Sequence, residues 1–306
     1  MADLLLGIDG GGSKTRVLLA DRDGNLRGVG TAPSSNYQSV GWEAATNALH
    51  TAIGAAMQHA GPDDAIAAAC FGLAGVDRPA DREEYTAWVK HQAYAPRFTI
   101  VNDAELVLAA GTPAGWGVAL ICGTGSICYG RSPDGRTTRA GGWGYLLGDE
   151  GSGYDIGVQA LRLATQTADG RASAHRVLSA ILEHWQLNDP SELIGYVYRP
   201  ETTRATVAAL GGRIAALASQ GDGDASAIMS GAARELGRLS AAVVRRLDLA
   251  EPPVALGGGL LVGTPGLQQQ IKTLAGVPLG TLTPVEDPAR GAIVIARRLL
   301  ESPDSR

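Results

Sequence analysis

Residues 7–15 read GIDGGGSKT, and this stretch decides the fold prediction. A short apolar run precedes it, so a buried strand leads directly into a glycine turn that ends in Ser13 and Lys14. The turn is not a Walker A loop, because that loop needs a glycine directly before its lysine and Ser13 stands between them. It is not a dinucleotide fingerprint either, because the third glycine of that motif would fall at Thr15. The stretch is therefore a strand-turn-strand loop of another kind.

Two later glycine turns have the same character. CGTGSIC at residues 122–128 and ALGGGLL at residues 255–261 each follow an apolar strand and also lack the dinucleotide fingerprint. Backbone N–H groups in such turns can wrap phosphate oxygens, because no side chain hinders a close approach. Four hydroxyl side chains add possible donors: Ser13, Thr15, Thr124 and Ser126. Taken singly, each turn is also explained by the positive φ values that glycine tolerates.

The second glycine turn lies in a segment that repeats the layout of the N-terminus. Residues 118–139, VALICGTGSICYGRSPDGRTTR, read as strand, glycine turn, strand, Asp-Gly turn and strand, as residues 4–31 do. Ser13 and Ser126 occupy matching places, about 113 residues apart. The pattern predicts a duplicated three-strand unit in two related α/β domains, although two glycine-rich hairpins can also look alike by chance.

Helices are predicted where apolar residues recur at helical spacing. We expect them at residues 41–60, 81–94, after residue 103 and at residues 224–247. A last helix follows residue 287, with Asp287 as its N-cap and Pro288 at its first position. Residues 65–75 and 97–101 read as further buried strands, so strands and helices alternate along the chain.

Composition places the chain among ordinary globular proteins. Its 306 residues suffice for about two domains, and 45% hydrophobic residues allow a sizeable core. A net charge of −5 without a long basic run argues against a dedicated nucleic-acid or membrane-surface binder. Cys70, Cys122 and Cys128 form neither a CxxC pair nor an even disulfide set. Since the N-terminus also lacks a signal-peptide pattern, we expect a reducing, cytoplasmic location.

Asp9 ends the first apolar run, where its carboxylate can hold Mg²⁺ directly or through water. In proteins Mg²⁺ commonly uses one or two carboxylates together with substrate phosphates. Lys14 adds a positive charge to the same turn, although a solvated surface lysine is the simpler interpretation of that residue.

Together these features resemble the sugar kinase/hsp70/actin superfamily. GIDGGGSKT resembles its first phosphate loop, CGTGS its second and ALGGGLL its adenosine loop. The segments VNDAELV (101–107) and DPARGAIVIA (287–296) resemble its two connecting segments at the hinge. All five motifs occur in the order of the superfamily, between residues 7 and 296.

The resemblance implies an α/β fold of two actin/ribonuclease H-like domains, with mixed sheets flanked by helices and an ATP cleft between them. Residues 1–110 plus 288–306 are expected to form a small N-terminal domain, and residues 111–287 a larger C-terminal one. The hinge is expected near Gly111 and Asp287, and closure there would exclude water from the reaction.

Two segments narrow the resemblance to N-acetylglucosamine kinases and their relatives in the BadF/BadG/BcrA/BcrD ATPase family. These are GGWGYLLGDEGS (141–152) and SSNYQSVG (34–41). They imply a kinase that uses ATP and Mg²⁺ to phosphorylate the 6-hydroxyl of an amino sugar. N-acetylglucosamine is the first candidate, with glucosamine and N-acetylmuramic acid as alternatives. A homodimer is a candidate state because relatives are often dimers, and no nucleic-acid or membrane partner is expected.

By the same resemblance, Asp103 is the catalytic base that accepts the proton of the sugar hydroxyl. An unperturbed Asp carboxyl, with a pKa of about 3.9, is ionised at neutral pH and can orient that hydroxyl for attack. The alternative is a helix N-cap, a role that Asn102 could fill equally well.

Six residues are implied to bind the sugar: Asn36, Asp103, Gly142, Trp143, Asp149 and Glu150. Plain core packing is the alternative for Trp143. Capping of the following helix is the alternative for Asp149 and Glu150, and the cap and ligand roles can coexist. The nucleotide is implied to contact the three turns: Gly10, Gly11, Gly12, Ser13, Lys14, Thr15, Gly123, Thr124, Gly125, Ser126, Gly257, Gly258 and Gly259. Asp9 is the implied metal ligand.

Two positions depart from the pattern of the animal enzymes. Those enzymes carry Ser where this chain has Ala74, and Asn where it has Ile127, both near the 2-acetamido group of the sugar. The hexose end of the site is therefore retained, while recognition of the N-acetyl group is in question.

Two other functions share this fold. An ATPase activator of a 2-hydroxyacyl-CoA dehydratase or benzoyl-CoA reductase would carry an iron–sulfur cluster, but Cys122 and Cys128 lie in strands and are expected to pack rather than bind iron. A non-catalytic sugar sensor would usually carry an N-terminal helix-turn-helix, and the first glycine turn begins too early to leave room for one.

Overall fold

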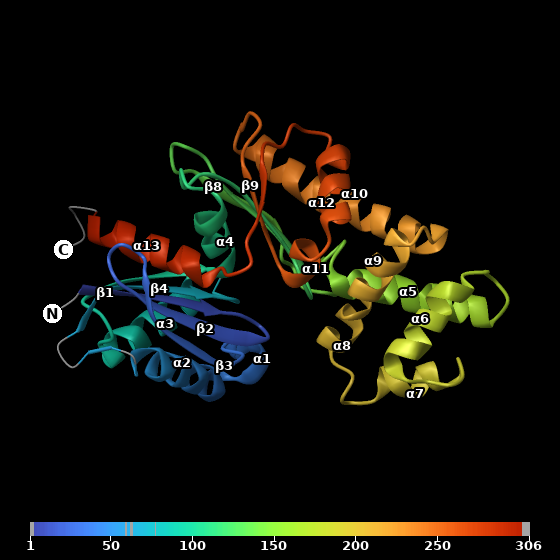
Figure 1. Ribbon diagram of the computed structural model, residues 1–306, viewed down its shortest axis with the longest axis horizontal. Coiled ribbons are helices and arrows are strands. Elements are labelled where there is room, and N and C mark those ends of the chain that lie inside the picture. Colours follow the sequence, from blue (N-terminus) through green and yellow to red (C-terminus); the bar gives the residue numbers. More distant parts are fainter. Residues whose placement is uncertain (1–2, 59, 62–63, 77, 302–306) are drawn as a thin grey trace. The chain divides into compact units, whose positions relative to one another are not determined.

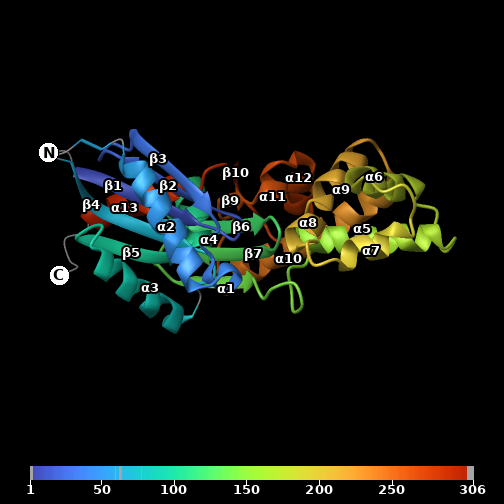
Figure 2. The ribbon, with the colours of Figure 1, turned by 90° about the horizontal axis from the view of Figure 1, so that it is seen from below.

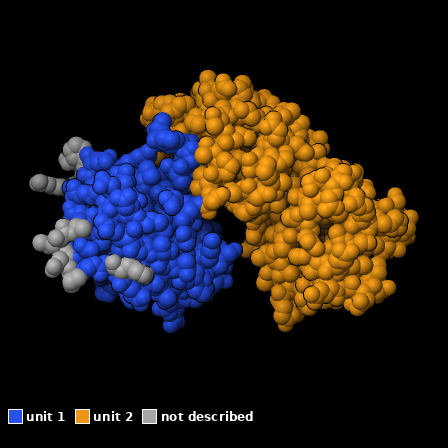
Figure 3. Space-filling model, viewed as in Figure 1, with its two compact units in different colours: residues 1–115, 287–306 blue, residues 116–286 orange. Residues whose placement is uncertain are grey.

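The computed structural model describes residues 3–58, 60–61, 64–76 and 78–301. The chain divides into two compact units, coloured separately in Figure 3. Unit 1 comprises residues 1–115 and 287–306, and unit 2 comprises residues 116–286. The domain boundaries expected from the sequence, after residues 110 and 287, lie a few residues away and stay a prediction.

The described part of unit 1 contains a five-stranded mixed sheet of order β3-β2-β1-β4-β5 (Figure 1). Its strands are β1 (Asp3–Gly10), β2 (Lys14–Ala20), β3 (Leu26–Pro33), β4 (Ala65–Leu73) and β5 (Arg97–Asn102). β2 is antiparallel to both β1 and β3, whereas β4 is parallel to β1 and to β5. Strands β3, β1, β4 and β5 therefore all end at the same edge of the sheet.

Helices cover both faces of this sheet. They are α1 (Tyr37–Val40), α2 (Trp42–Met57), α3 (Pro79–Gln92), α4 (Asp103–Gly111) and α13 (Ala289–Glu301). Side chains alternate along β1, so Leu4 and Leu6 pack with α2 and α3, while Leu5 packs with α13. Gly7 lies directly under α13, where a Cβ atom would come within 2.9 Å of the backbone of that helix. The uninterrupted apolar run of β1 thus reflects burial on both faces.

Unit 2 repeats this topology. Its described sheet has the order β10-β9-β6-β7-β8, with β6 in the place of β1. The strands are β6 (Gly117–Cys122), β7 (Ser126–Arg131), β8 (Thr137–Gly141), β9 (Val254–Gly257) and β10 (Leu282–Pro284). The two hairpins are again antiparallel, and β9 is parallel to both β6 and β10. The predicted duplication of a three-strand unit is confirmed.

Unit 2 is otherwise helical, and Figure 2 shows these helices from a second side. They are α5 (Gly153–Ala168), α6 (His175–Trp185), α7 (Glu192–Tyr198), α8 (Arg204–Ala208), α9 (Leu210–Ser219), α10 (Gly223–Arg246), α11 (Gly259–Val262) and α12 (Pro265–Leu274). One apolar core joins them to the sheet, with α10 packed on β7 and β8. The predicted helix at residues 224–247 corresponds to α10.

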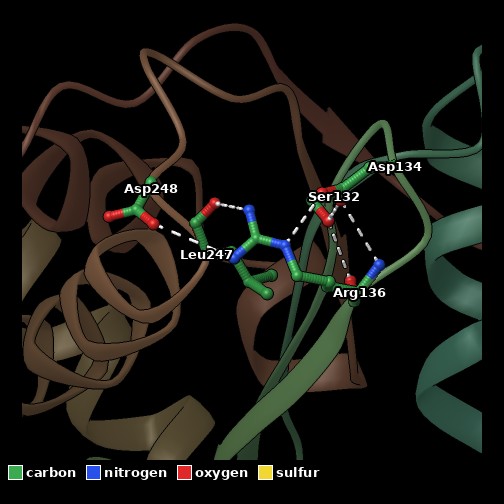
Figure 4. Close-up of polar contacts among 5 residues, drawn as sticks. All are labelled: Ser132, Asp134, Arg136, Leu247 and Asp248. Atoms are coloured by element: carbon green, nitrogen blue, oxygen red, sulfur yellow. Dashed lines mark hydrogen bonds and ion pairs between the residues drawn. The ribbon is translucent and has the colours of Figure 1, made fainter.

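The Asp-Gly turn between β7 and β8 is attached to the end of α10 (Figure 4). Arg136 Nε donates to Asp134 at 2.9 Å, and Arg136 Nη2 donates to the Leu247 carbonyl at 3.4 Å. Ser132 and Arg136 both donate hydrogen bonds to Asp134 and lower the pKa of its carboxyl to about 2. Arg136 Nη1 also lies 3.8 Å from Asp248. The cluster is structural, because its donors and acceptors satisfy one another.

The three cysteines are free and buried. Burial raises the pKa of the Cys122 and Cys128 thiols to about 12. Cys122 Sγ donates to the Gly151 carbonyl at 3.4 Å. As predicted, Cys122 and Cys128 pack inside the protein. Among the helices of the described residues, none combines the length and apolar character needed to cross a bilayer.

Candidate active site

In unit 1, the predicted residues gather where the parallel strands end. Asp9 is near the end of β1, Ala74 follows β4, Asp103 follows β5 and Asn36 follows β3. The loops touch, because the Ala74 N–H donates to the Gly10 carbonyl at 2.8 Å. Ligands of open α/β sheets commonly bind outside the carboxyl ends of the strands. The fold thus brings the predicted residues of this unit to one edge.

The carboxyl of Asp9 lies in a negatively charged environment. It is half-buried, and its partner across the β1–β2 ladder is Arg16. Burial, and after it the charges of Asp103 and Asp287, raise the pKa of Asp9 to about 7, although Lys14 and Arg16 act to lower it. The charges of Asp103 and Asp287 therefore both repel the ionised carboxylate of Asp9, and a cation bound there would relieve this repulsion.

Arg16 and Asp287 were not among the predicted site residues. Arg16 Nε lies 3.0 Å from both carboxylate oxygens of Asp287, and both side chains are partly buried. Asp287 was expected as a helix N-cap and near the hinge, but not as a partner of Arg16. The two residues are 271 positions apart in the chain, so no local sequence pattern could reveal their ion pair. The pair attaches β2 to the residue that begins the second segment of unit 1.

Asp103 is the first residue of α4 and does not cap it. The cap is Asn102, whose side chain accepts from the Ala104 N–H at 2.9 Å, while Glu105 completes the capping box. The capping interpretation of Asp103 is therefore wrong. Its carboxylate stands at the N-terminus of α4.

Asn36 is the N-cap of the short helix α1. Its Oδ1 accepts from the Gln38 N–H at 3.1 Å and lies against the loop after β4, 3.1 Å from where a Cβ on Gly75 would be. The amide oxygen is thus used by the fold, and the amide nitrogen is the group that can face a ligand. Asn36 and Ala74 belong to adjoining loops, as binding of one sugar would require.

In unit 2, the second and third glycine turns lie side by side. They follow β6 and β9, whose parallel pairing matches Ile121 with Gly257. Gly258 has φ +86°, and a Cβ there would lie 2.3 Å from the Cys122 carbonyl oxygen and 2.8 Å from the Gly123 nitrogen. Only glycine allows this approach. The structure therefore joins the two turns into one backbone surface.

Asp149 belongs to the same part of unit 2. Its Oδ1 accepts from the Ser126 N–H at 3.1 Å and would lie 2.8 Å from a Cβ on Gly125. Burial raises the pKa of its carboxyl, while the Ser126 N–H and the charge of Arg204 act in the opposite direction. The following helix α5 is capped by Ser152. The capping alternative for Asp149 is therefore wrong, and its carboxylate adjoins the second glycine turn.

Two of the four predicted hydroxyl donors serve the fold. Thr15 Oγ1 donates to the Pro33 carbonyl at 2.7 Å, and Ser126 Oγ donates to the Glu150 carbonyl at 2.9 Å. Both side chains are buried. Ser13 is exposed and Thr124 is half-buried, so these are the hydroxyl groups that a phosphate could reach. Lys14 is exposed as well.

Trp143 is 66% exposed, so the core-packing alternative for this residue is wrong. The Arg139 guanidinium lies 5.0 Å from the centre of its ring. The preceding Gly142 has φ +69° and lies against Ile127. Glu150 is exposed at the other end of this segment. Ile127, one of the departures from the animal pattern, thus lies beside Gly142, one of the predicted sugar-binding residues.

Comparison with known proteins gives consistent matches over nearly the whole chain. Residues 6–296 match the model of the BadF/BadG/BcrA/BcrD ATPase family. An N-acetylmuramic acid/N-acetylglucosamine kinase of Clostridium acetobutylicum is 34% identical over 96% of this chain and 98% of its own length. An N-acetyl-D-glucosamine kinase of Dictyostelium discoideum is 34% identical over 84% of this chain and 86% of its own. The solved structure of a proposed N-acetylglucosamine kinase of Chromobacterium violaceum has a TM-score of 0.70 at 30% identity, covering 96% of this chain and 99% of its own.

Proposed function

The chain belongs to the BadF/BadG/BcrA/BcrD ATPase family, and on this premise we propose that it is a kinase that uses ATP to phosphorylate the 6-hydroxyl of an amino sugar. N-acetylglucosamine is the proposed substrate, with glucosamine and N-acetylmuramic acid as alternatives. Both curated relatives, each 34% identical, are named as kinases of N-acetylglucosamine, and one is also named for N-acetylmuramic acid.

One observation carries the proposal: Asp9 and Asp103 stand at the same edge of the unit 1 sheet and act on each other electrostatically. In the proposed reaction, Asp103 orients the sugar hydroxyl and accepts its proton as the oxygen attacks the terminal phosphoryl group. Phosphoryl transfer depends mainly on positioning and charge neutralisation, and general-base help contributes roughly 10²–10⁴-fold. Asn36 and Asp149 are proposed to hold other hydroxyl groups of the sugar.

We propose Asp9 as the residue that holds Mg²⁺. The described residues contain no cluster of three or more His, Cys, Asp or Glu side chains arranged to bind a metal. A single carboxylate suits Mg²⁺, which keeps waters and substrate phosphates as its other ligands. When bound, the ion neutralises charge on the phosphates. The negative surroundings of Asp9 fit this assignment.

The phosphates of ATP are proposed to contact the backbone of the three glycine turns. Gly10–Lys14 would bind them from unit 1, and Gly123–Gly125 with Gly257–Gly259 from unit 2. Ser13 and Thr124 would add hydroxyl donors, and Lys14 a positive charge. The contact between Gly258 and Gly123 supports a shared role for the second and third turns.

The buried cysteines disfavour the dehydratase-activator alternative. An iron–sulfur cluster binds thiolates, but Cys122 and Cys128 have a raised pKa of about 12 inside the core. No specific observation favours the sugar-sensor alternative.

A coupled assay of ADP release tests the proposal. N-acetylglucosamine, N-acetylmuramic acid, glucosamine and glucose are compared at saturating ATP and Mg²⁺, with a no-sugar reaction as the control. We expect sugar-dependent turnover with at least one amino sugar. ADP release that no sugar accelerates would rule out the kinase.

A cytoplasmic homodimer is the proposed state of the enzyme. The free cysteines fit a reducing compartment. Light scattering coupled to size-exclusion chromatography would give the mass, and a monomer would refute the dimer.

A further inference from the structure

An arginine side chain that has no role in the proposed reaction lies beside the segment that carries Asp149. Arg204 is the first residue of α8, and its guanidinium lies 5.0 Å from the centre of the Tyr145 ring. Tyr145 in turn packs edge-on against Tyr154, with ring centres 5.4 Å apart. Tyr145 lies between β8 and α5, as Asp149 does, and Tyr154 is in the first turn of α5. Arg204 therefore adjoins the proposed sugar-binding segment.

Close backbone contact fixes α8 in this place (Figure 2). A Cβ on Gly157 would lie 2.3 Å from the Val207 carbonyl oxygen, and one on Gly153 would lie 2.9 Å from that of Ala208. Thr203 caps α8 through the Thr206 N–H. The position of Arg204 at the start of α8 is thus set by packed backbone.

The charge of Arg204 influences Asp149, although the two side chains form no ion pair. Burial raises the pKa of Asp149, and Arg204 is one of the groups that lower it. Within the described residues, no carboxylate forms an ion pair with Arg204 and no acceptor receives a hydrogen bond from it. Arg139 differs, because its Nη1 donates to the Gly141 carbonyl at 2.8 Å and its guanidinium covers Trp143. Of these two arginines, Arg204 is the one whose guanidinium N–H groups are available to bind a ligand.

We infer that Arg204 binds a carboxylate carried by the sugar and makes this a kinase for acidic amino sugars such as N-acetylmuramic acid. This inference rests on the proposed function. N-acetylmuramic acid is N-acetylglucosamine with a lactyl ether, which adds one carboxylate and one methyl group. The planar guanidinium matches a carboxylate through two parallel hydrogen bonds. Leu146 and Leu147, 80% and 79% exposed on the same segment, offer apolar surface for the methyl group.

The test compares three sugars with four proteins. The kcat/KM values are measured for N-acetylmuramic acid, its methyl ester and N-acetylglucosamine. The proteins are the wild type, Arg204→Ala, Arg204→Lys and the control Arg199→Ala. Arg199 is matched, since it is exposed and its guanidinium lies 3.7 Å from the centre of the Tyr196 ring in the same unit.

Arg204→Ala should lower the ratio of kcat/KM for N-acetylmuramic acid to that for N-acetylglucosamine by about 10- to 100-fold, mainly through KM. Arg204→Lys should restore part of the ratio, and Arg199→Ala should leave it as in the wild type. The methyl ester, which is uncharged, should be insensitive to Arg204→Ala.

Three results would overturn the inference. One is an unchanged ratio in Arg204→Ala, and another is an effect confined to the KM of ATP, which would make Arg204 a nucleotide ligand. The third is a wild type that phosphorylates N-acetylglucosamine but not N-acetylmuramic acid, which would leave the proposed function intact. A wild type without any sugar-dependent turnover would instead refute the proposed function, and this inference with it.

Discussion

The charged form of Asp9 is opposed by burial and by two neighbouring carboxylates. The pKa of its carboxyl is 3.8 in an unperturbed chain and about 7 in the folded protein. Between pH 3.8 and about 7, the folded protein therefore binds a proton at Asp9 that the unfolded chain has lost. The stability that protonated Asp9 contributes is lost as the pH rises through about 7. A residue that destabilises its own fold at neutral pH is typical of a functional site.

Asp9→Asn should therefore stabilise the protein more at pH 8 than at pH 5, because the cost of the Asp9 carboxyl grows as the pH rises from about 4 to about 7. Asn resembles the protonated carboxyl, so the gain at pH 8 should be of the order of 1–4 kcal/mol in the free energy of unfolding. Urea unfolding at the two pH values without Mg²⁺ measures it. Added Mg²⁺ should stabilise the wild type alone at pH 8. Equal stabilities at pH 8 would contradict the assigned surroundings of Asp9.

Asp103→Asn should abolish phosphoryl transfer while sugar binding is largely kept. The amide cannot accept the proton, although it keeps the size and a hydrogen-bonding oxygen of the carboxylate. Turnover is measured by ADP release, and binding by calorimetry with the sugar. The matched control is Asn102→Ala, which removes the N-cap of α4 and should cost about 1 kcal/mol of stability. An active Asp103→Asn enzyme would refute its role as the base.

The glycine turn between β9 and α11 contains a position, Gly258, at which only glycine fits. Gly258 combines a positive φ with contact between two backbone segments, whereas a Cβ on the next residue, Gly259, would have no atom within 4 Å. The difference comes from the parallel pairing of β6 and β9, which brings the ends of both strands together.

Gly258→Ala should destabilise unit 2 by roughly 1–3 kcal/mol, because the new methyl group meets the Cys122 carbonyl and the backbone must leave its conformation. The same shift should raise the KM for ATP, since it moves the second and third turns apart. Thermal unfolding and steady-state kinetics measure the two effects. Gly259→Ala is the control and should keep the stability of the wild type. Equal stability losses in both variants would contradict the packing described.

The two units differ in how the chain builds them. Unit 2 is one continuous segment, residues 116–286, and its apolar core is formed within that segment. Unit 1 needs two segments, because α13 fills one face of its sheet. A continuous segment with its own core can in principle fold alone.

A fragment of residues 116–286 should therefore unfold cooperatively in urea and show near-ultraviolet circular dichroism. A fragment of residues 1–115 should not, because the face of β1 that carries Leu5 and Gly7 lacks its covering helix. Adding a peptide of residues 287–306 should restore its structure. A cooperatively folded 1–115 fragment, or an unfolded 116–286 fragment, would contradict this division.

Much of the fold could be predicted because its signals are local. Apolar alternation and glycine turns predict strands, and helical spacing predicts helices such as α10. The repeat around Ser13 and Ser126 predicted that both units share one topology, and the sheets confirm it. The motifs also supplied the candidate residues of the site, whose catalytic and binding roles stay predictions.

Other features could not be predicted, because they depend on which side chains meet. The hydroxyl groups of Thr15 and Ser126 look like phosphate donors in the sequence but are used by Pro33 and Glu150. Trp143 could equally have been a core residue, and its exposure follows only from where its segment leaves β8.

By itself, the sequence determined the strands around the glycine turns, several of the helices and the duplicated topology, because backbone preference and hydrophobic period act over a few neighbouring residues. Only the tertiary structure decided the charge around Asp9, the ion pair between Arg16 and Asp287, and the place of Arg204 beside Tyr145. Electrostatic and packing forces act through space, and these residues meet only when the sheets and helices are assembled.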